Sequence, residues 1–260
     1  MQPEFWNDKR PAGVPDSLDF AAYRSVVEVF ERSCKKFADR PAFSNLGVTL
    51  SYAELDRLSA AFAAYLQKQT DLQPGDRIAV QMPNVLQYPI AVFGALRAGL
   101  VVVNTNPLYT AREMRHQFKD AGVRALVYLN VFGKLVEEVL PDTRIEYLIE
   151  ARMGDLLPAL KGWLVNSVVK SVKKMVPDYR LPQALPFRQA LKQGQGHALQ
   201  PVRAMPCSRS GSAWRMSPCC STPAAPPGSR RGRCSPTATW WRTCCRSTPS
   251  FPSSARMACR

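Results

Sequence analysis

The chain has 260 residues, a formal net charge of +15, a sequence pI of about 9.8 and eight cysteines. Its first twenty residues contain four acidic side chains and no apolar stretch, so they do not predict a secretory signal peptide. Arg97 interrupts the longest apolar candidate, Tyr88–Val103, and we therefore expect no transmembrane helix, which needs about twenty apolar residues.

The first predicted elements are two helices with a hairpin between them. Ser25 and Ser51, like Thr110 farther along the chain, each stand three residues before a Glu, an arrangement in which the hydroxyl and the carboxylate cap the start of a helix. The predicted elements are helix Val26–Phe37, strands Ala42–Ser44 and Val48–Leu50 around a turn at Asn45–Gly47, and helix Tyr52–Gln69. Cys34 lies on the first helix, and we expect a buried structural thiol there.

The next segments alternate between strands and helices. The predicted elements are strand Arg77–Gln81, strand Leu100–Asn104, helix Ala111–Ala121, strand Ala125–Leu129, helix Val131–Val139 and strand Tyr147–Ile149. Leu100–Asn104 is an apolar run after Gly99, as in a parallel strand that is buried on both faces. This order predicts an α/β fold, with a mainly parallel sheet and flanking helices.

The segment Leu156–Val176 combines an aliphatic face with a basic one at helical spacing. The side chains concerned are Leu156, Leu157, Leu160, Trp163, Leu164, Lys170, Lys173 and Lys174. This pattern is typical of a helix lying in an anionic membrane interface, and also of a helix that packs on the core with a solvated basic side. Pro177 ends the segment, and Leu181–Gln200 is predicted to be a connecting loop.

The last sixty residues have a different composition from the rest. Residues 1–200 carry twenty-five Lys and Arg against all twenty Asp and Glu, whereas residues 201–260 carry ten Arg and no acid. This tail also holds eleven Ser, nine Pro and seven Cys, without Lys, Leu, Ile, Asn, Gln, His or Tyr. A disordered linker normally keeps some Lys, Glu or Gln, so the composition indicates a GC-rich gene translated out of frame. The tail has no C-x-x-C pair and no His, so we predict no zinc site.

Two sequence blocks resemble the first two core motifs of the adenylate-forming enzymes. Leu50–Leu55 reads L-S-Y-A-E-L, and Leu96–Thr110 reads L-R-A-G-L-V-V-V-N-T-N-P-L-Y-T. Within that superfamily, Gln81–Asn84 (Q-M-P-N) and Asn104–Glu113 are similar to bacterial long-chain fatty-acid–CoA ligases. The resemblance covers about residues 1–200 and implies an incomplete N-terminal portion of the large domain of these enzymes.

The resemblance implies a reaction with three substrates. Family members make an acyl-adenylate from ATP and a fatty acid, with Mg²⁺, and then transfer the acyl group to CoA. The first step needs a Ser/Thr/Gly-rich loop whose backbone amides hold the phosphates. That loop is expected shortly after residue 200, where no such sequence stands.

The sequence of the missing loop can be recovered by a shift of one base in the reading frame. In the shifted frame, each codon from Met216 onward consists of the last base of the preceding codon and its own first two bases. Cys219-Cys220 must then encode Leu, Trp240-Trp241 must encode Val, and about thirty consecutive positions permit the loop and its following helix. We therefore expect residues 1–200 to be a partial N-terminal domain, and residues 201–260 to be an out-of-frame, unstructured tail.

No residue of the chain is assigned a catalytic, cofactor-binding or metal-binding role, because no catalytic residue of the family maps to residues 1–200. The chain is expected to bind neither ATP, Mg²⁺ nor CoA and to be inactive. His116 is expected on the surface, and Asn106 and Tyr109 are expected to shape the loop that contains them. We expect a cytoplasmic protein, with peripheral contact to the inner face of the membrane.

Two alternatives remain open. The parent enzyme is either a long-chain ligase or a related adenylate-forming ligase for medium-chain or aryl acids, since the residues that select the acid lie outside this chain. From another class, an Arg-rich tail with Trp240-Trp241 has the composition of a nucleic-acid-binding arm, because Arg neutralises phosphates and Trp stacks on bases. The codon regrouping argues against this arm, and no specific nucleic-acid partner is expected.

Overall fold

The computed structural model of the protein describes residues 23–169, 176–200 and 202. In chain order the elements are α1 (Val26–Lys36), β1 (Pro41–Asn45), β2 (Val48–Ser51), α2 (Tyr52–Lys68), β3 (Arg77–Gln81), α3 (Gln87–Arg97), β4 (Val101–Asn104), α4 (Ala111–Ala121), β5 (Val123–Leu129), η3 (Asn130–Phe132), α5 (Gly133–Val139), η4 (Leu140–Asp142), β6 (Tyr147–Ala151), α6 (Ala159–Ser167), β7 (Ala184–Pro186) and α7 (Phe187–Gly194). The predicted tail, apart from Val202, lies outside the described residues.

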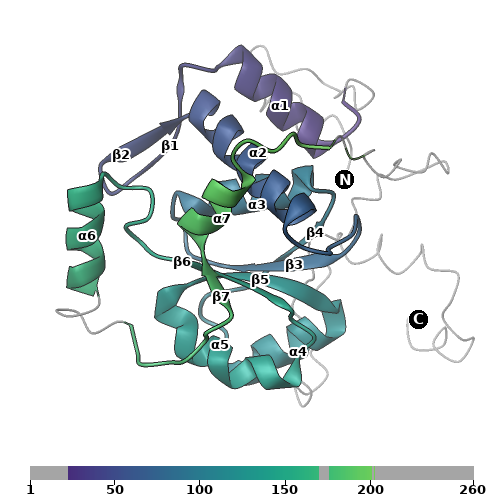
Figure 1. The fold of residues 1–260 in the computed structure, drawn as a ribbon, viewed down its shortest axis with the longest axis vertical. Helices are drawn as coiled ribbons and strands as arrows, with labels where there is room; N and C mark the ends of the chain where they lie inside the picture. Colours follow the sequence, from purple (N-terminus) through teal and green to yellow (C-terminus); the bar gives the residue numbers. More distant parts are fainter. Residues whose placement is uncertain (1–22, 170–175, 201, 203–260) are drawn as a thin grey trace, which may run out of the picture. The chain divides into compact units, whose positions relative to one another are not determined.

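A parallel sheet of five strands organises these elements. Its strand order is β4-β3-β5-β6-β7, and every neighbouring pair is parallel. Helices α1, α2, α3 and α7 lie on one face, and α4 and α5 lie on the other (Figure 1). The predicted α/β fold with a mainly parallel sheet is therefore confirmed.

Each face of the sheet has its own apolar core. Under α2 and α3 the core contains Phe62 and Ile78, which are fully buried. The two helices approach so closely that a Cβ added to Gly94 would lie 2.8 Å from Phe62 Cδ1. On the opposite face, Met114 and Phe118 of α4 pack against the sheet. Burying one such large side chain stabilises the fold by about 1.5–3 kcal/mol.

The predicted helix starts and hairpin are confirmed. Ser51 Oγ accepts from Glu54 N at 3.2 Å, and the Glu54 carboxylate accepts from Ser51 N at 2.9 Å. Thr110 and Glu113 make the same reciprocal pair at the start of α4. Strands β1 and β2 pair antiparallel, and their turn holds Leu46 at a φ of +50°, in the left-handed region that favours glycine and asparagine.

One prediction about the later part of the chain is wrong, and a second needs a new boundary. Leu181–Gln200 is not a loop, since it contains β7 and α7, whose Phe187, Ala190 and Leu191 are buried. These apolar positions have helical spacing, but α7 has only eight residues, and its core partners lie far away in sequence. The helix predicted over Leu156–Val176 begins at Ala159, after Pro158, and the part of the prediction over residues 170–175 lies outside the described residues.

Arg97, at the end of α3, joins the first three helices. Its side chain is 8% exposed and contacts the carboxylate of Asp56 at 2.7 Å and that of Glu31 at 3.3 Å. The guanidinium also donates to Asp56 O and to Ser59 Oγ, each at 2.9 Å. Its carbon lies 5.5 Å from the ring centroid of Phe30. These contacts fix α1 and α2 against α3.

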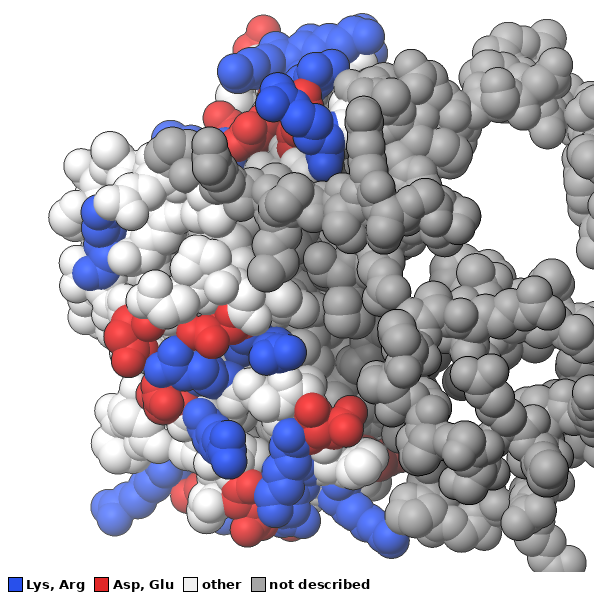
Figure 2. Space-filling model, turned by 90° about the vertical axis from the view of Figure 1, so that its right-hand side faces the viewer, with Lys and Arg blue, Asp and Glu red and all other residues white. Residues whose placement is uncertain are grey.

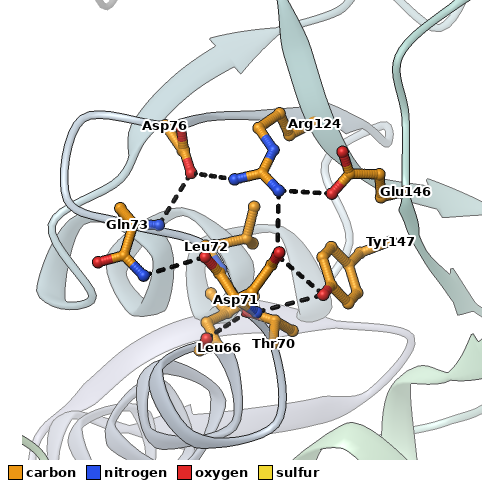
Figure 3. A network of polar contacts seen from close by, with 9 residues as sticks. All are labelled: Leu66, Thr70, Asp71, Leu72, Gln73, Asp76, Arg124, Glu146 and Tyr147. Atoms are coloured by element: carbon orange, nitrogen blue, oxygen red, sulfur yellow. Dashed lines mark hydrogen bonds and ion pairs between the residues drawn. The ribbon is translucent and has the colours of Figure 1, made fainter.

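A second polar network closes the amino end of the sheet (Figure 3). Arg124 of β5 donates to Asp76 at 2.7 Å, to Asp71 at 3.0 Å and to Glu146 at 2.5 Å. The Tyr147 hydroxyl also donates to Asp71, at 2.9 Å. This hydrogen bond and the nearby Arg124 charge hold the pKa of Asp71 below its ordinary value. The network joins the loop before β3 to the first residues of β5 and β6.

Candidate functional site

The carboxyl ends of the parallel strands carry a row of polar side chains. Gln81, Tyr128 and Glu150 occupy the same register position on β3, β5 and β6. Thr105 follows β4, and its amide donates to Val80 O at 3.0 Å, next to Gln81. Gln81, Tyr128 and Thr105 are at most 4% exposed, and the side chain of Glu150 is 11% exposed. Ligands of open α/β sheets bind outside the carboxyl ends of the strands, so this row is the natural place to look for a site.

Glu150 is the most heavily contacted member of the row. Its carboxylate accepts from the hydroxyl of Tyr179 at 2.9 Å, from that of Tyr128 at 3.3 Å, and from Arg152 Nε at 3.0 Å. Burial, followed by the influence of Glu150, raises the pKa of both tyrosines, so the two hydroxyls stay protonated and donate. The cluster fixes the segment around Tyr179 against the sheet.

Several buried oxygens of this region have no hydrogen-bond partner within the described residues. They are Gln81 Oε1, Thr105 Oγ1 and Asn130 Oδ1. The amide nitrogen of Gln81 does have one contact, to Met114 Sδ at 3.2 Å. An unpaired buried oxygen costs about 1–3 kcal/mol unless it meets a water molecule or a ligand. The carboxyl edge can therefore accept hydrogen bonds at three further points.

A cavity of about 640 Å³ opens beside Glu150. It is lined by Asn130, Glu150, Arg152, Asn166, Val176, Pro177, Asp178, Tyr179, Arg180, Leu181 and Pro182. Its lining offers two guanidinium groups, two carboxylates and several neutral polar groups. Such a surface can bind a polar molecule by hydrogen bonds, but it does not by itself define a reaction.

The loop after β4 contains the residues that carry the second sequence motif. Asn106 Oδ1 accepts from Leu108 N at 3.0 Å, and Asn106 O accepts from Tyr109 N at 3.1 Å. Asn106 therefore shapes this loop, as predicted, and Tyr109 takes part through its backbone. Before the loop, the side chain of Asn104 accepts from the Tyr88 hydroxyl at 3.0 Å.

The structure also tests the predictions for His116 and Cys34. His116 is exposed and Cys34 is buried, both as predicted. Burial, followed by the Asp56 charge, raises the pKa of Cys34 to about 11. Within the described ranges, there is no group of three or more His, Cys, Asp or Glu side chains that can hold a metal ion.

The α6 surface differs from the core-packing interpretation of its sequence, and the membrane interpretation stays a prediction. Leu157 is buried just before the helix, but Leu160, Trp163 and Leu164 of α6 are 80%, 67% and 54% exposed. These three side chains do not pack on the core. Lys170, Lys173 and Lys174 lie outside the described residues, so the predicted basic face stays a prediction. No helix in the described part of the chain is long and apolar enough to cross a membrane.

Charged side chains of both signs are interspersed on the face shown in Figure 2. Lys and Arg lie beside Asp and Glu over the described part of this face. The mixture does not give that part the single-sign surface that binds a phosphate backbone.

Comparisons with known proteins agree on one family. The AMP-binding enzyme family matches residues 30–190. A long-chain-fatty-acid–CoA ligase of Yersinia pestis is 50% identical over 190 residues, and one of Escherichia coli O157:H7 is 49% identical over 189. Each alignment covers 73% of this chain and 34% of the relative, so the chain spans about a third of their length. A luciferase-like enzyme from the Zophobas morio mealworm has the same fold, with a TM-score of 0.54 at 16% identity over 72% of this chain and 39% of that one.

Proposed function

The chain belongs to the AMP-binding enzyme family, and from this we propose that residues 1–200 are the N-terminal part of a long-chain fatty-acid–CoA ligase. The parent reaction converts ATP, a fatty acid and CoA into acyl-CoA, AMP and diphosphate through an acyl-adenylate. The carrying observation is the 50% identity with a ligase named for long-chain acids. Similarity to a ligase with this name favours long-chain acids over medium-chain or aryl acids as the substrate. It does not identify the residues that select the acid.

We propose further that the 260-residue chain forms no acyl-adenylate. The phosphate-binding loop that this chemistry needs is absent from residues 201–260, which we interpret as translated out of frame. On this proposal ATP, Mg²⁺ and CoA are cofactors and substrates of the parent enzyme, and the chain itself binds none of them.

The test is an acyl-CoA assay on the purified chain with ATP, Mg²⁺, CoA and radiolabelled oleate. We expect no thioester above a blank without protein. A single-base repair within codons 201–216 that lets translation continue past Arg260 is expected to give activity. Thioester formation by the unrepaired chain would refute the proposed inactivity. A repaired protein that is active only on aryl acids would refute the proposed substrate class.

We also propose a cytoplasmic protein that contacts the inner face of the membrane through α6. Support comes from the exposed Leu160, Trp163 and Leu164, since leucine and tryptophan partition into the interface. Lys170, Lys173 and Lys174 follow in the sequence, and each lysine close to an anionic surface contributes about 1 kcal/mol. A peripheral site of this kind would place a ligase beside its lipid-derived substrate.

A further inference from the structure

The exposed apolar side chains are concentrated on two elements. Nine large apolar side chains are exposed among the described residues, and five of them lie on the β1–β2 hairpin and α6. The hairpin contributes Phe43 and Leu46, and α6 contributes Leu160, Trp163 and Leu164. Figure 1 places α6 beside the turn end of the hairpin. The five side chains therefore belong to neighbouring elements rather than to scattered positions.

Direct contacts hold the hairpin turn against α6. Lys161 Nζ donates to Leu46 O at 2.7 Å, and the same nitrogen would lie 3.2 Å from a Cβ added to Gly47. At the base of the turn, Asn45 Nδ2 donates to Asn84 O at 3.0 Å, which anchors the hairpin to the loop after β3. These hydrogen bonds hold the hairpin turn and α6 next to each other, so their exposed side chains belong to one region of the surface.

Leu46 occupies a backbone conformation that does not suit leucine. Its φ of +50° is one that asparagine or glycine adopts with less strain. Its side chain is nevertheless 46% exposed, so core packing does not explain the choice of a large apolar residue. A strained, exposed apolar residue at a turn is reason to look for a contact outside the chain.

The charges on the hairpin and α6 indicate what kind of surface Leu46 contacts. Residues 41–51 contain no charged side chain, and α6 contains Lys161 and no acid. The two elements therefore carry one positive charge and no carboxylate to repel an anionic lipid. We infer that the hairpin turn and α6 form one lipid-contact surface, in which Leu46 enters an anionic membrane interface together with Trp163. This inference rests on the proposed membrane contact of α6 and adds the hairpin to it.

Binding of the full 260-residue chain to sucrose-loaded vesicles tests the inference. Vesicles of phosphatidylglycerol and phosphatidylcholine are compared with vesicles of phosphatidylcholine alone. Leu46→Asn removes the apolar side chain and suits the positive φ, so the variant is not expected to lose stability, which thermal unfolding checks. We expect its partition coefficient on anionic vesicles to fall about three- to tenfold. Leu108→Asn makes the same change at a leucine that is 86% exposed in a different loop, and no change in binding is expected.

A third variant, Trp163→Ser, separates this inference from the proposal about α6. A loss of binding in both Leu46→Asn and Trp163→Ser supports the combined surface. A loss in Trp163→Ser alone overturns the role of the hairpin and leaves the α6 contact standing. No binding of the wild-type chain to anionic vesicles overturns both, and so does self-association through these side chains without lipid. The ligase assignment is unaffected by any of these results, because its own assay measures acyl-CoA formation.

Discussion

Replacing Arg97 with methionine should destabilise the fold by about 2–3 kcal/mol. The guanidinium makes two hydrogen bonds to neutral acceptors, Asp56 O and Ser59 Oγ, and a bond from a charged group to such an acceptor is worth about 1.5–3 kcal/mol. The carboxylates of Asp56 and Glu31 are about two-fifths exposed, so each ion pair adds at most about 1 kcal/mol. Methionine fills the space of the arginine stem, and removal of the buried charge offsets part of the loss.

Urea unfolding followed by circular dichroism measures this change. The control is Arg57→Met on α2, which removes the same charge from an exposed position and should change stability by less than about 0.5 kcal/mol. Equal midpoints for the Arg97→Met variant and the wild type would refute the reasoning. An equally large loss in the Arg57→Met variant would attribute the effect to net charge instead of to the contacts of Arg97.

Three further predictions concern single side chains. Thr105→Val should stabilise the fold by about 1 kcal/mol in thermal unfolding, because it removes an unpaired buried hydroxyl, and clear destabilisation would mean that the hydroxyl has a partner. Cys34, with its pKa raised to about 11, should be modified by a disulfide reagent at pH 8 only when urea unfolds the chain. Mass spectrometry of the peptide that contains Cys34 separates it from the seven cysteines of residues 201–260, and rapid modification of Cys34 in the folded chain would contradict its burial. Asp71 has a folded pKa below its ordinary value of 3.8, so its stabilisation is present above that pH and is lost as the pH falls through the folded pKa. The Tyr147→Phe variant should therefore lose less stability than the wild type when the pH falls below about 4. An unchanged acid unfolding transition would show that this hydrogen bond does not lower the pKa of Asp71.

Local signals in the sequence were sufficient for most of the first 150 residues. The caps at Ser51 and Thr110 use residues three positions apart, so the starts of α2 and α4 can be predicted without knowledge of the fold. Helix α7 could not be predicted in this way. Its buried residue Phe187 packs against Phe62, at a ring-centroid distance of 5.3 Å, and this partner is remote in sequence.

The candidate site depends on strand register, which is also a non-local property. Gln81 and Glu150 are ordinary strand residues in the sequence, and only pairing through Tyr128 places them in one row. The amide nitrogen of Gln81 contacts Met114 Sδ of α4, and its buried oxygen has no hydrogen-bond partner within the described residues. By contrast, the loop-forming role of Asn106 was predictable, because Asn side chains commonly accept from backbone amides two residues later.

The strand order also determines when the chain can complete its core during synthesis. β3 precedes β4 and β5 in sequence but lies between them in the sheet, so one edge of β3 stays open until Leu129 has left the ribosome. The packing of helix α2 is completed later still, when α7 has been synthesised. Helix α7 lies so close to α2 that Gly194 has no room for a Cβ beside Ala61 O. A chain stalled before residue 187 would expose part of the apolar surface of α2, where a chaperone that recognises unfolded segments would bind it.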